Sequence, residues 1–334
     1  MNSPKLSVLD QSPIPSGSTG SKALSNTLEL AGLADRLGYH RYWVAEHHGT
    51  LTLAGASPEV LIATIAARTS RIRVGSGGVM LPHYSPLKVA ETFSILSGLN
   101  PGRIDLAIGR ASGTNPLTML ALQRDRSRAA PDDFPEQLGE LMAYLYGFAE
   151  PHPFDKIPLP GWPELPELWL LGSSHQSGLW AAELGLPYAF ADFINPEGGF
   201  VAELYRDRFV PTARLEMPRV CVAVSAICAG TDEEAELLAS SYRALWVQIR
   251  SGTSTEVPGV EQAQEFLAAQ EPPKRREPPR RLLVGSPKKV AMGLRDVGAE
   301  YGADEVMVVT ITHDHQARMR SYELIAEAFE LGNA

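Results

Sequence analysis

Short runs of apolar residues alternate with longer amphipathic stretches along the whole chain. Eight of these runs have the length and composition of buried strands, at 6–9, 42–45, 72–74, 104–108, 168–171, 188–190, 220–227 and 305–311. They are apolar on both faces, as expected for a parallel sheet that is covered by helices. The alternation therefore predicts a repeated βα unit.

The amphipathic stretches between these runs carry helix signals at their ends. Ser57 and Ser85 each precede a proline, which places a capping residue before proline at the first helical position. Thr231 and Glu234 have the spacing of a capping box, and Gly38 is suited to ending the first helix. Eight strands with their helices predict a (β/α)₈ barrel, with an open doubly wound sheet as the alternative.

The length of 334 residues suits one such barrel, and we expect a single domain over 1–334. Two segments, 115–135 and 251–281, interrupt the repeat. Long segments after barrel strands lie at the carboxyl-terminal rim, where lids and sites are built. Surface insertions without a function are the alternative for both segments.

Composition narrows the functional classes. The net charge of −9 argues against a nucleic-acid-binding surface, and we expect the basic run within 274–281, among prolines, to be a solvated loop. Cys221 and Cys228 lie seven apart in one predicted strand, so they point to opposite faces and cannot pair. With no signal-peptide pattern and no apolar run of membrane length, a cytoplasmic protein is expected.

The segment after the fifth strand indicates an anion site. Gly172 is followed by Ser173 and Ser174, and the chain enters a helix at about Ser177. Free backbone N–H groups and hydroxyls at a helix N-terminus bind anions, most often phosphate. A plain serine cap is the alternative.

Arg110 strengthens the phosphate interpretation, because an arginine at a strand end must pair with an acid or face a ligand. Arg128, in the segment that leaves the same strand, has the reach to close over the same anion. A solvated loop arginine is the alternative for Arg128, which follows Arg124 and Arg126.

Two further segments follow strands. Glu46, His47 and His48 follow the second strand, and the adjacent histidines diverge on an extended chain, so they suit one metal ion poorly. A histidine facing the barrel mouth beside Glu46 could act as a general base or acid, and a core histidine is the alternative. Gly77 and Gly78 follow the third strand, where they admit a flat ligand or form a barrel corner.

Taken in order, the segments resemble the luciferase-like flavin monooxygenases. The matching stretches are 43–48, 74–82 with Pro86 and Ala90-Glu91, 102–110, and 173–187. The resemblance implies that reduced FMN binds in the barrel mouth. Its phosphate would bind to a loop with Ser173, Ser174 and Ser177 and to two arginines, Arg110 and Arg128. The resemblance also implies a non-proline cis peptide at Gly77-Gly78 under the flavin ring, and it makes His47 the histidine that assists flavin–oxygen chemistry.

The chain also departs from luciferase. Gly109 stands where luciferase carries a reactive cysteine, and the long mobile loop is missing, so we do not expect light emission. The resemblance implies a monooxygenase that uses O₂ and reduced FMN from a separate NAD(P)H:flavin reductase on a small organic substrate. A homodimer is expected from the same resemblance.

Three alternatives remain open at this point. The first keeps the barrel but uses a deazaflavin coenzyme for hydride transfer. The second is a metal-dependent hydrolase built on Glu46, His47, His48, His83 and Asp105. The third is a flavin-binding protein without catalytic activity.

Overall fold

A ring of parallel strands forms the centre of this computed structural model, which describes residues 4–110, 114–127, 132–149, 151–253, 255–270 and 280–332. Eight strands within these ranges close the barrel in the order β1–β2–β3–β5–β6–β7–β8–β10, because β10 pairs with both β8 and β1. The predicted (β/α)₈ barrel is confirmed. The bounds are β1 Lys5–Asp10, β2 Arg41–Val44, β3 Arg73–Ser76, β5 Ile104–Gly109, β6 Glu167–Gly172, β7 Tyr188–Ala191, β8 Val220–Cys228 and β10 Glu305–Val309.

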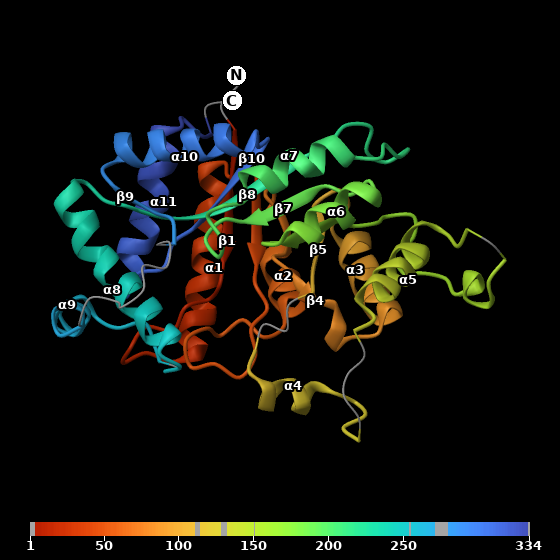
Figure 1. Ribbon diagram of the computed structural model, residues 1–334, viewed down its shortest axis with the longest axis horizontal. Coiled ribbons are helices and arrows are strands. Elements are labelled where there is room, and N and C mark those ends of the chain that lie inside the picture. Colours follow the sequence, from red (N-terminus) through yellow and green to blue (C-terminus); the bar gives the residue numbers. More distant parts are fainter. Residues whose placement is uncertain are drawn as a thin grey trace.

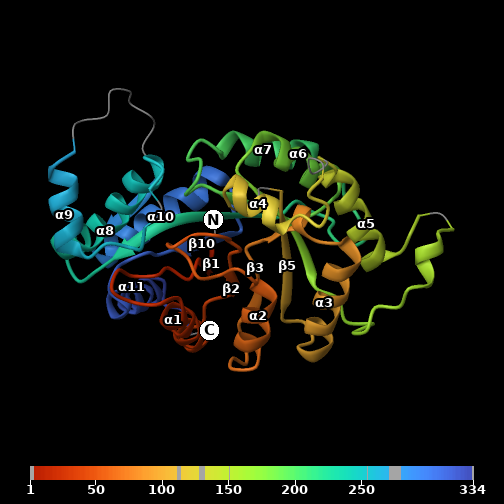
Figure 2. The ribbon, with the colours of Figure 1, turned by 90° about the horizontal axis from the view of Figure 1, so that it is seen from below.

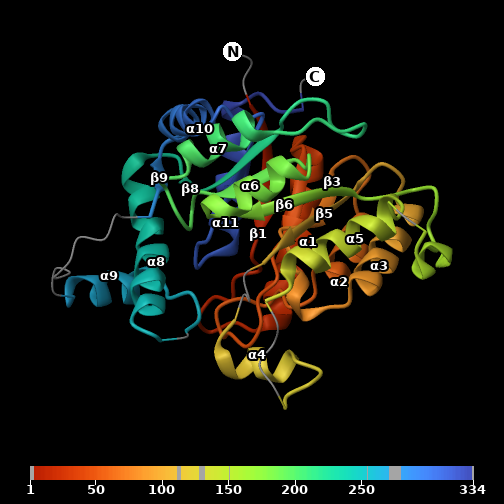
Figure 3. The same cartoon turned by 45° about the vertical axis from the view of Figure 1, so that its right-hand side comes forward.

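Helices surround this barrel, as Figures 1 and 2 show. Helix α4 lies apart from the others, across the lower end in Figure 1, and both termini lie at the opposite end. Figure 3 shows α9 beside α8 at the edge of the molecule. The bounds are α1 Gly20–Leu37, α2 Pro58–Ala66, α3 Pro86–Leu99, α4 Pro116–Leu122, α5 Phe134–Tyr146, α6 His175–Glu183, α7 Gly199–Arg208, α8 Asp232–Arg250, α9 Val260–Ala268, α10 Pro287–Tyr301 and α11 His315–Ala328.

The core has two parts because neighbouring side chains on a strand point to opposite faces. Tyr42 belongs to the larger part, between the sheet and the helices. Trp43 belongs to the smaller part inside the barrel, where its ring meets Trp169 edge-on at 5.4 Å between centroids. Cys221 and Cys228 are likewise divided between the two parts, and both are free thiols, as the odd spacing predicted.

Charged side chains fill the amino-terminal end of the barrel. Arg41, the first residue of β2, lies 2.8 Å from Asp105, 2.7 Å from Glu167 and 3.0 Å from Glu305. Arg73 also pairs with Asp105. These residues stand at or near the starts of their strands, so Asp105 lies at the end of the barrel opposite to the residues that follow the strands.

Most of the predicted helix ends are present, with differences in how they are capped. Ser57 and Ser85 occupy cap positions but their side chains make no capping hydrogen bond. The Thr231 hydroxyl accepts from the N–H of Glu234 at 3.1 Å, and Gly38 ends α1 with φ of 86°. Proline at the first helical position already removes one unsatisfied N–H, which lessens the need for the serine caps.

The two rim segments contain helices. Segment 115–135 carries α4, and segment 251–281 carries α9. Two short strands were not predicted: β4, Val79–Met80, which pairs with β5, and β9, Leu282–Gly285, which pairs with β8. Within the described ranges, the helices are too short or too polar to span a membrane.

Candidate functional site

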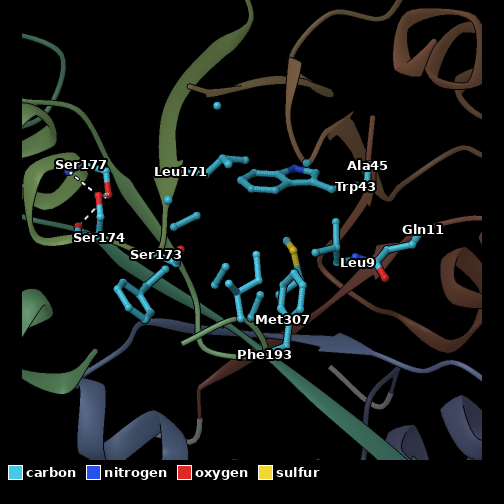
Figure 4. A pocket seen from close by; sticks show the side chains of 18 of the residues that line it. Leu9, Gln11, Trp43, Ala45, Leu171, Ser173, Ser174, Ser177, Phe193 and Met307 are labelled. Atoms are coloured by element: carbon cyan, nitrogen blue, oxygen red, sulfur yellow. Dashed lines mark hydrogen bonds between the residues drawn. The ribbon is translucent and has the colours of Figure 1, made fainter. Parts of the chain in front are cut away.

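A cavity of about 540 Å³ lies at the carboxyl-terminal ends of the barrel strands. In Figure 4, three serines lie at one end of this cavity and Gln11 lies at the other. The walls between them are mainly apolar, with Trp43 on one side and Met307 on the other. This is the end of a (β/α)₈ barrel at which active sites are found.

Ser173 and Ser174 form the turn that joins β6 to α6, and Ser177 lies in the first turn of α6. Ser174 is the N-cap of α6, and its hydroxyl accepts from the N–H of Ser177 at 3.3 Å. The Ser177 hydroxyl donates to the Ser174 carbonyl and lies 2.9 Å from the Tyr188 hydroxyl. Asn195 donates to the Ser173 carbonyl at 3.1 Å. These bonds hold the turn at the cavity wall, with the hydroxyls and the helix N-terminus together.

Arg110 lines the same cavity directly after β5. One of its guanidinium nitrogens lies 3.0 and 2.8 Å from the two carboxylate oxygens of Asp132, and both side chains are half or more exposed, at 51% and 74%. The guanidinium also lies 5.7 Å from the ring of Trp180 on α6. Arg110 thus pairs with an acid and borders the cavity. Arg128, the other arginine expected near this end, lies outside the described residues.

Gly77 and Gly78 join β3 to β4 through a cis peptide bond, as the resemblance implied. A Cβ atom on Gly78 would come within 2.6 Å of the Ala107 carbonyl oxygen and 2.7 Å of a Leu171 methyl group. Gly77 lines the cavity, and its own Cβ would meet Leu9 at 2.5 Å. The absence of side chains is therefore required by close packing around this turn.

His47 borders the cavity from the segment after β2. Its Nδ1 atom is buried and has no hydrogen-bond partner within the described part of the chain. Burial, with a smaller contribution from the neighbouring His48, lowers the pKa of His47 from 6.5 to about 4. His47 is thus a neutral imidazole that lines the cavity, and its Nδ1 atom is buried and unpaired within the described residues.

Glu46 and His48 are not among the residues that line this cavity. The fully buried Glu46 carboxylate lies 2.7 Å from His48 Nε2 and accepts from the Tyr84 hydroxyl at 2.9 Å and from the Met80 N–H at 3.0 Å. The structure therefore does not bring Glu46 to the place where a catalytic acid or base would meet a ligand. On an extended segment, residues i and i+2 share a face, and this spacing could have predicted the pair of Glu46 with His48.

A second cavity, of about 330 Å³, adjoins the first. Gln11, His47 and Trp246 line both cavities. Gln11 follows β1 directly, and residues directly after other strands were predicted to lie at the site, so the same reasoning could have identified Gln11. Trp246 lies inside α8 and Arg280, which also lines the first cavity, precedes β9. Their sequence neighbourhoods carry no motif, so these two residues could not be recognised from the pattern.

Asp105, which the hydrolase alternative required near the histidines, lies in the charged cluster at the other end of the barrel. No group of three or more His, Cys, Asp or Glu side chains suited to a metal ion occurs in the described ranges. The described residues therefore give no support to the hydrolase alternative.

The sequence model for the luciferase-like monooxygenases matches residues 5–305 of the chain. The chain belongs to this family. Among curated luciferase-like monooxygenases, it is 43% identical to the Escherichia coli K12 protein of that name, over 97% of this chain and 96% of the relative. It is 37% identical to the N-acetyl-S-alkylcysteine monooxygenase of Bacillus subtilis, over 97% and 98% of the two chains.

Solved structures agree with the family assignment. The crystal structure of apo-MsnO8 matches with a TM-score of 0.90 and 43% identity, over 98% of both chains. Two more distant structures share the fold alone. They are an FMN complex of the oxygenating constituent of 3,6-diketocamphane monooxygenase, at 20% identity and a TM-score of 0.72, and an F420-dependent secondary alcohol dehydrogenase, at 15% and 0.67.

Proposed function

We propose that this luciferase-like monooxygenase uses reduced FMN and O₂ to oxygenate a small organic substrate, and that a separate NAD(P)H:flavin reductase supplies the reduced FMN. One observation carries the proposal: a single cavity combines an anion-binding end, an apolar middle and a neutral histidine. A phosphate, a flat ring and a reacting atom are the three parts that an FMN enzyme must accommodate.

The anion-binding end suits the phosphate of FMN. The hydroxyls of Ser173, Ser174 and Ser177 lie beside the N-terminus of α6, where unpaired N–H groups and the helix dipole favour a negative group. Arg110 lies at the cavity wall near Trp180 of the same helix, so its positive charge is available to the same group. Arg128 is proposed as a second phosphate ligand from the resemblance alone.

The middle of the cavity suits the isoalloxazine ring. Trp43, Leu171, Phe193 and Met307 offer large apolar surfaces. Gly77, which contributes no side chain to the wall, lets a flat ligand come close to the backbone there. An apolar enclosure also excludes water from the reacting atoms.

Reduced FMN, when bound, supplies the electrons that activate O₂. His47 is proposed to hold or release a proton through its imidazole, since this residue lines both cavities. Because burial keeps the imidazole neutral near pH 7, a ring nitrogen can accept a proton from a ligand. We assign Glu46 a positioning role, since it fixes His48 and the chain around His47 through three hydrogen bonds.

The test is an anaerobic titration of the protein with oxidised and with reduced FMN, followed by mixing with O₂ in a stopped-flow spectrometer. We expect tighter binding of reduced FMN. Ser177→Ala should weaken it about 2- to 12-fold, the cost of one hydrogen bond, and Thr231→Ala, which removes a helix cap outside the cavity, should not.

The same experiment tests the role of His47. His47→Gln should leave the dissociation constant of reduced FMN within about twofold of the wild-type value while changing the rate at which the bound flavin is oxidised. An unchanged oxidation rate would refute the proton role. A protein that binds neither redox form of FMN would refute the proposed function as a whole.

A deazaflavin-dependent dehydrogenase remains the second candidate, because the fold is shared with an F420-dependent alcohol dehydrogenase. It predicts binding of the deazaflavin coenzyme in preference to FMN and no consumption of O₂. A homodimer is proposed from the resemblance, and sedimentation equilibrium at several protein concentrations tests it.

A further inference from the structure

Arg280, in the segment before β9, lines the first cavity. Its guanidinium lies 3.7 Å from the centre of the Trp246 ring in α8 and donates to the Phe193 carbonyl, beyond the end of β7, at 3.1 Å. The phosphate-binding turn instead joins β6 to α6. Among the described residues, two arginines line this cavity, Arg110 and Arg280, and different elements hold them.

The two neighbouring arginines before β9 differ in their partners. Arg281 pairs with Glu300 and lies 3.3 Å from Asp192. Arg280 has no carboxylate partner within the part of the chain that the structure describes. A guanidinium offers five N–H donors, and the Phe193 carbonyl accounts for one of those of Arg280. Several donors therefore remain for a ligand in the cavity.

Burial makes this cation a costly feature unless an anion accompanies it. The surroundings lower the pKa of the Arg280 guanidinium, mainly through burial. The whole chain carries a net charge of −9, so an anionic ligand is repelled by the protein at large and needs a local positive group. Planar guanidinium and carboxylate groups match each other in two parallel hydrogen bonds.

Trp246 connects Arg280 to the second cavity, because its side chain lines both cavities. The second cavity combines apolar side chains with hydroxyl, amide and imidazole groups, and its lining within the described ranges includes no aspartate, glutamate, lysine or arginine. Besides Trp246, its apolar members are Leu53, Leu245, Ile249 and Ile311. Such a lining accommodates the uncharged part of a small molecule, next to His47.

From these observations, we propose that the substrate is a small organic carboxylate: Arg280 binds the carboxylate, and the uncharged remainder occupies the second cavity beside His47. This rests on the proposed function, because it assigns the phosphate end of the first cavity to FMN. The name of the Bacillus relative, N-acetyl-S-alkylcysteine monooxygenase, describes a substrate of this class for that protein.

The test compares N-acetyl-S-methylcysteine with its carboxamide, which differs from it in charge and little in shape. Their binding to the protein at saturating FMN is measured by isothermal titration calorimetry. We expect the acid to bind at least tenfold more tightly than the amide. Arg280→Met should abolish this preference, Arg280→Lys should retain part of it, and Arg281→Met should leave it intact.

The dissociation constant of FMN, measured on the same variants, shows whether Arg280 binds the substrate carboxylate or FMN. We expect it to stay within about twofold in Arg280→Met. A tenfold loss of FMN affinity with an unchanged preference for the acid would overturn the proposal and assign Arg280 to the flavin. A wild-type protein that binds FMN but binds the acid no better than the amide would overturn it as well, while the proposed function would stand.

Discussion

Replacing Asp132 by asparagine should strengthen the binding of FMN, although Asp132 lies outside the cavity lining. In the free protein, the Asp132 carboxylate holds one nitrogen of Arg110 through contacts of 3.0 and 2.8 Å. A phosphate that binds Arg110 must share or replace these contacts. Because both side chains are half or more exposed, the pair contributes at most about 1 kcal/mol. Its removal should tighten binding by up to about fivefold.

Arg110→Met should have the opposite and larger effect. Hydrogen bonds to a charged group are worth about 1.5 to 3 kcal/mol, so the loss of this arginine should weaken FMN binding by about 10- to 150-fold. The variant that combines Arg110→Met with Asp132→Asn shows whether Asp132 acts through Arg110 or by repelling the phosphate itself. If Asp132 acts by occupying Arg110, then Asp132→Asn has no effect on FMN binding once Arg110 is methionine.

Anaerobic fluorescence titration with reduced FMN measures all four proteins, at low and at high salt. We expect the gain from Asp132→Asn to shrink at high salt, since exposed ion pairs are screened. An equal gain with and without Arg110 would refute the competition and leave simple repulsion between Asp132 and the phosphate. Wild-type affinity in Arg110→Met would refute the phosphate role of Arg110.

Three other predictions concern stability. The pKa of His47 is lowered to about 4 in the folded protein, so this residue stays neutral at pH 5, whereas the unfolded chain takes up a proton as the pH falls through 6.5. The free energy of unfolding should therefore fall by about 1.5 kcal/mol between pH 6.5 and 5 from this residue, and urea unfolding of His47→Gln should show a smaller fall. Gly78→Ala should lower the free energy of unfolding by about 1 to 3 kcal/mol, because the new methyl group clashes with the Ala107 carbonyl. Calorimetry should show this as a lower Tm. Asp105→Asn should lower the free energy of unfolding by about 3 to 5 kcal/mol, measured by urea unfolding, because Arg41 and Arg73 lose a buried charged partner.

The sequence pattern predicted the barrel because strand burial and helix capping are local signals. The run 168–171 is apolar on both faces, and it became the centre of β6. Helix α4 has no buried residue, so no apolar periodicity marks it. The strand β9 pairs with the far end of β8, and a segment of four residues gives too little pattern to distinguish it from the rim loop.

The candidate site was predictable where residues follow strands and unpredictable where distant segments meet. Glycine and serines before α6, and Arg110 after β5, carry their meaning in the local sequence. The pairing of Arg110 with Asp132 joins residues at the two ends of a rim segment, and the path of that segment has no signal in the local sequence. The contact of Arg280 with Trp246 joins two residues that are 34 positions apart, on α8 and before β9, and no spacing rule connects them.

The two ends of single strands have different roles in this barrel. Strand β5 carries Asp105 near its start, in the charged cluster, and Arg110 after its end, at the cavity. Strand β2 begins with Arg41 of the same cluster and leads into His47. Side chains of the smaller core part lie between the two ends, and Trp43 joins them, because its indole N–H donates to Asp105 at 2.9 Å and its side chain lines the cavity. A charge change at Asp105 can therefore reach the cavity through Trp43, whereas substitutions at Arg110, His47 or Ser173 alter the cavity wall directly.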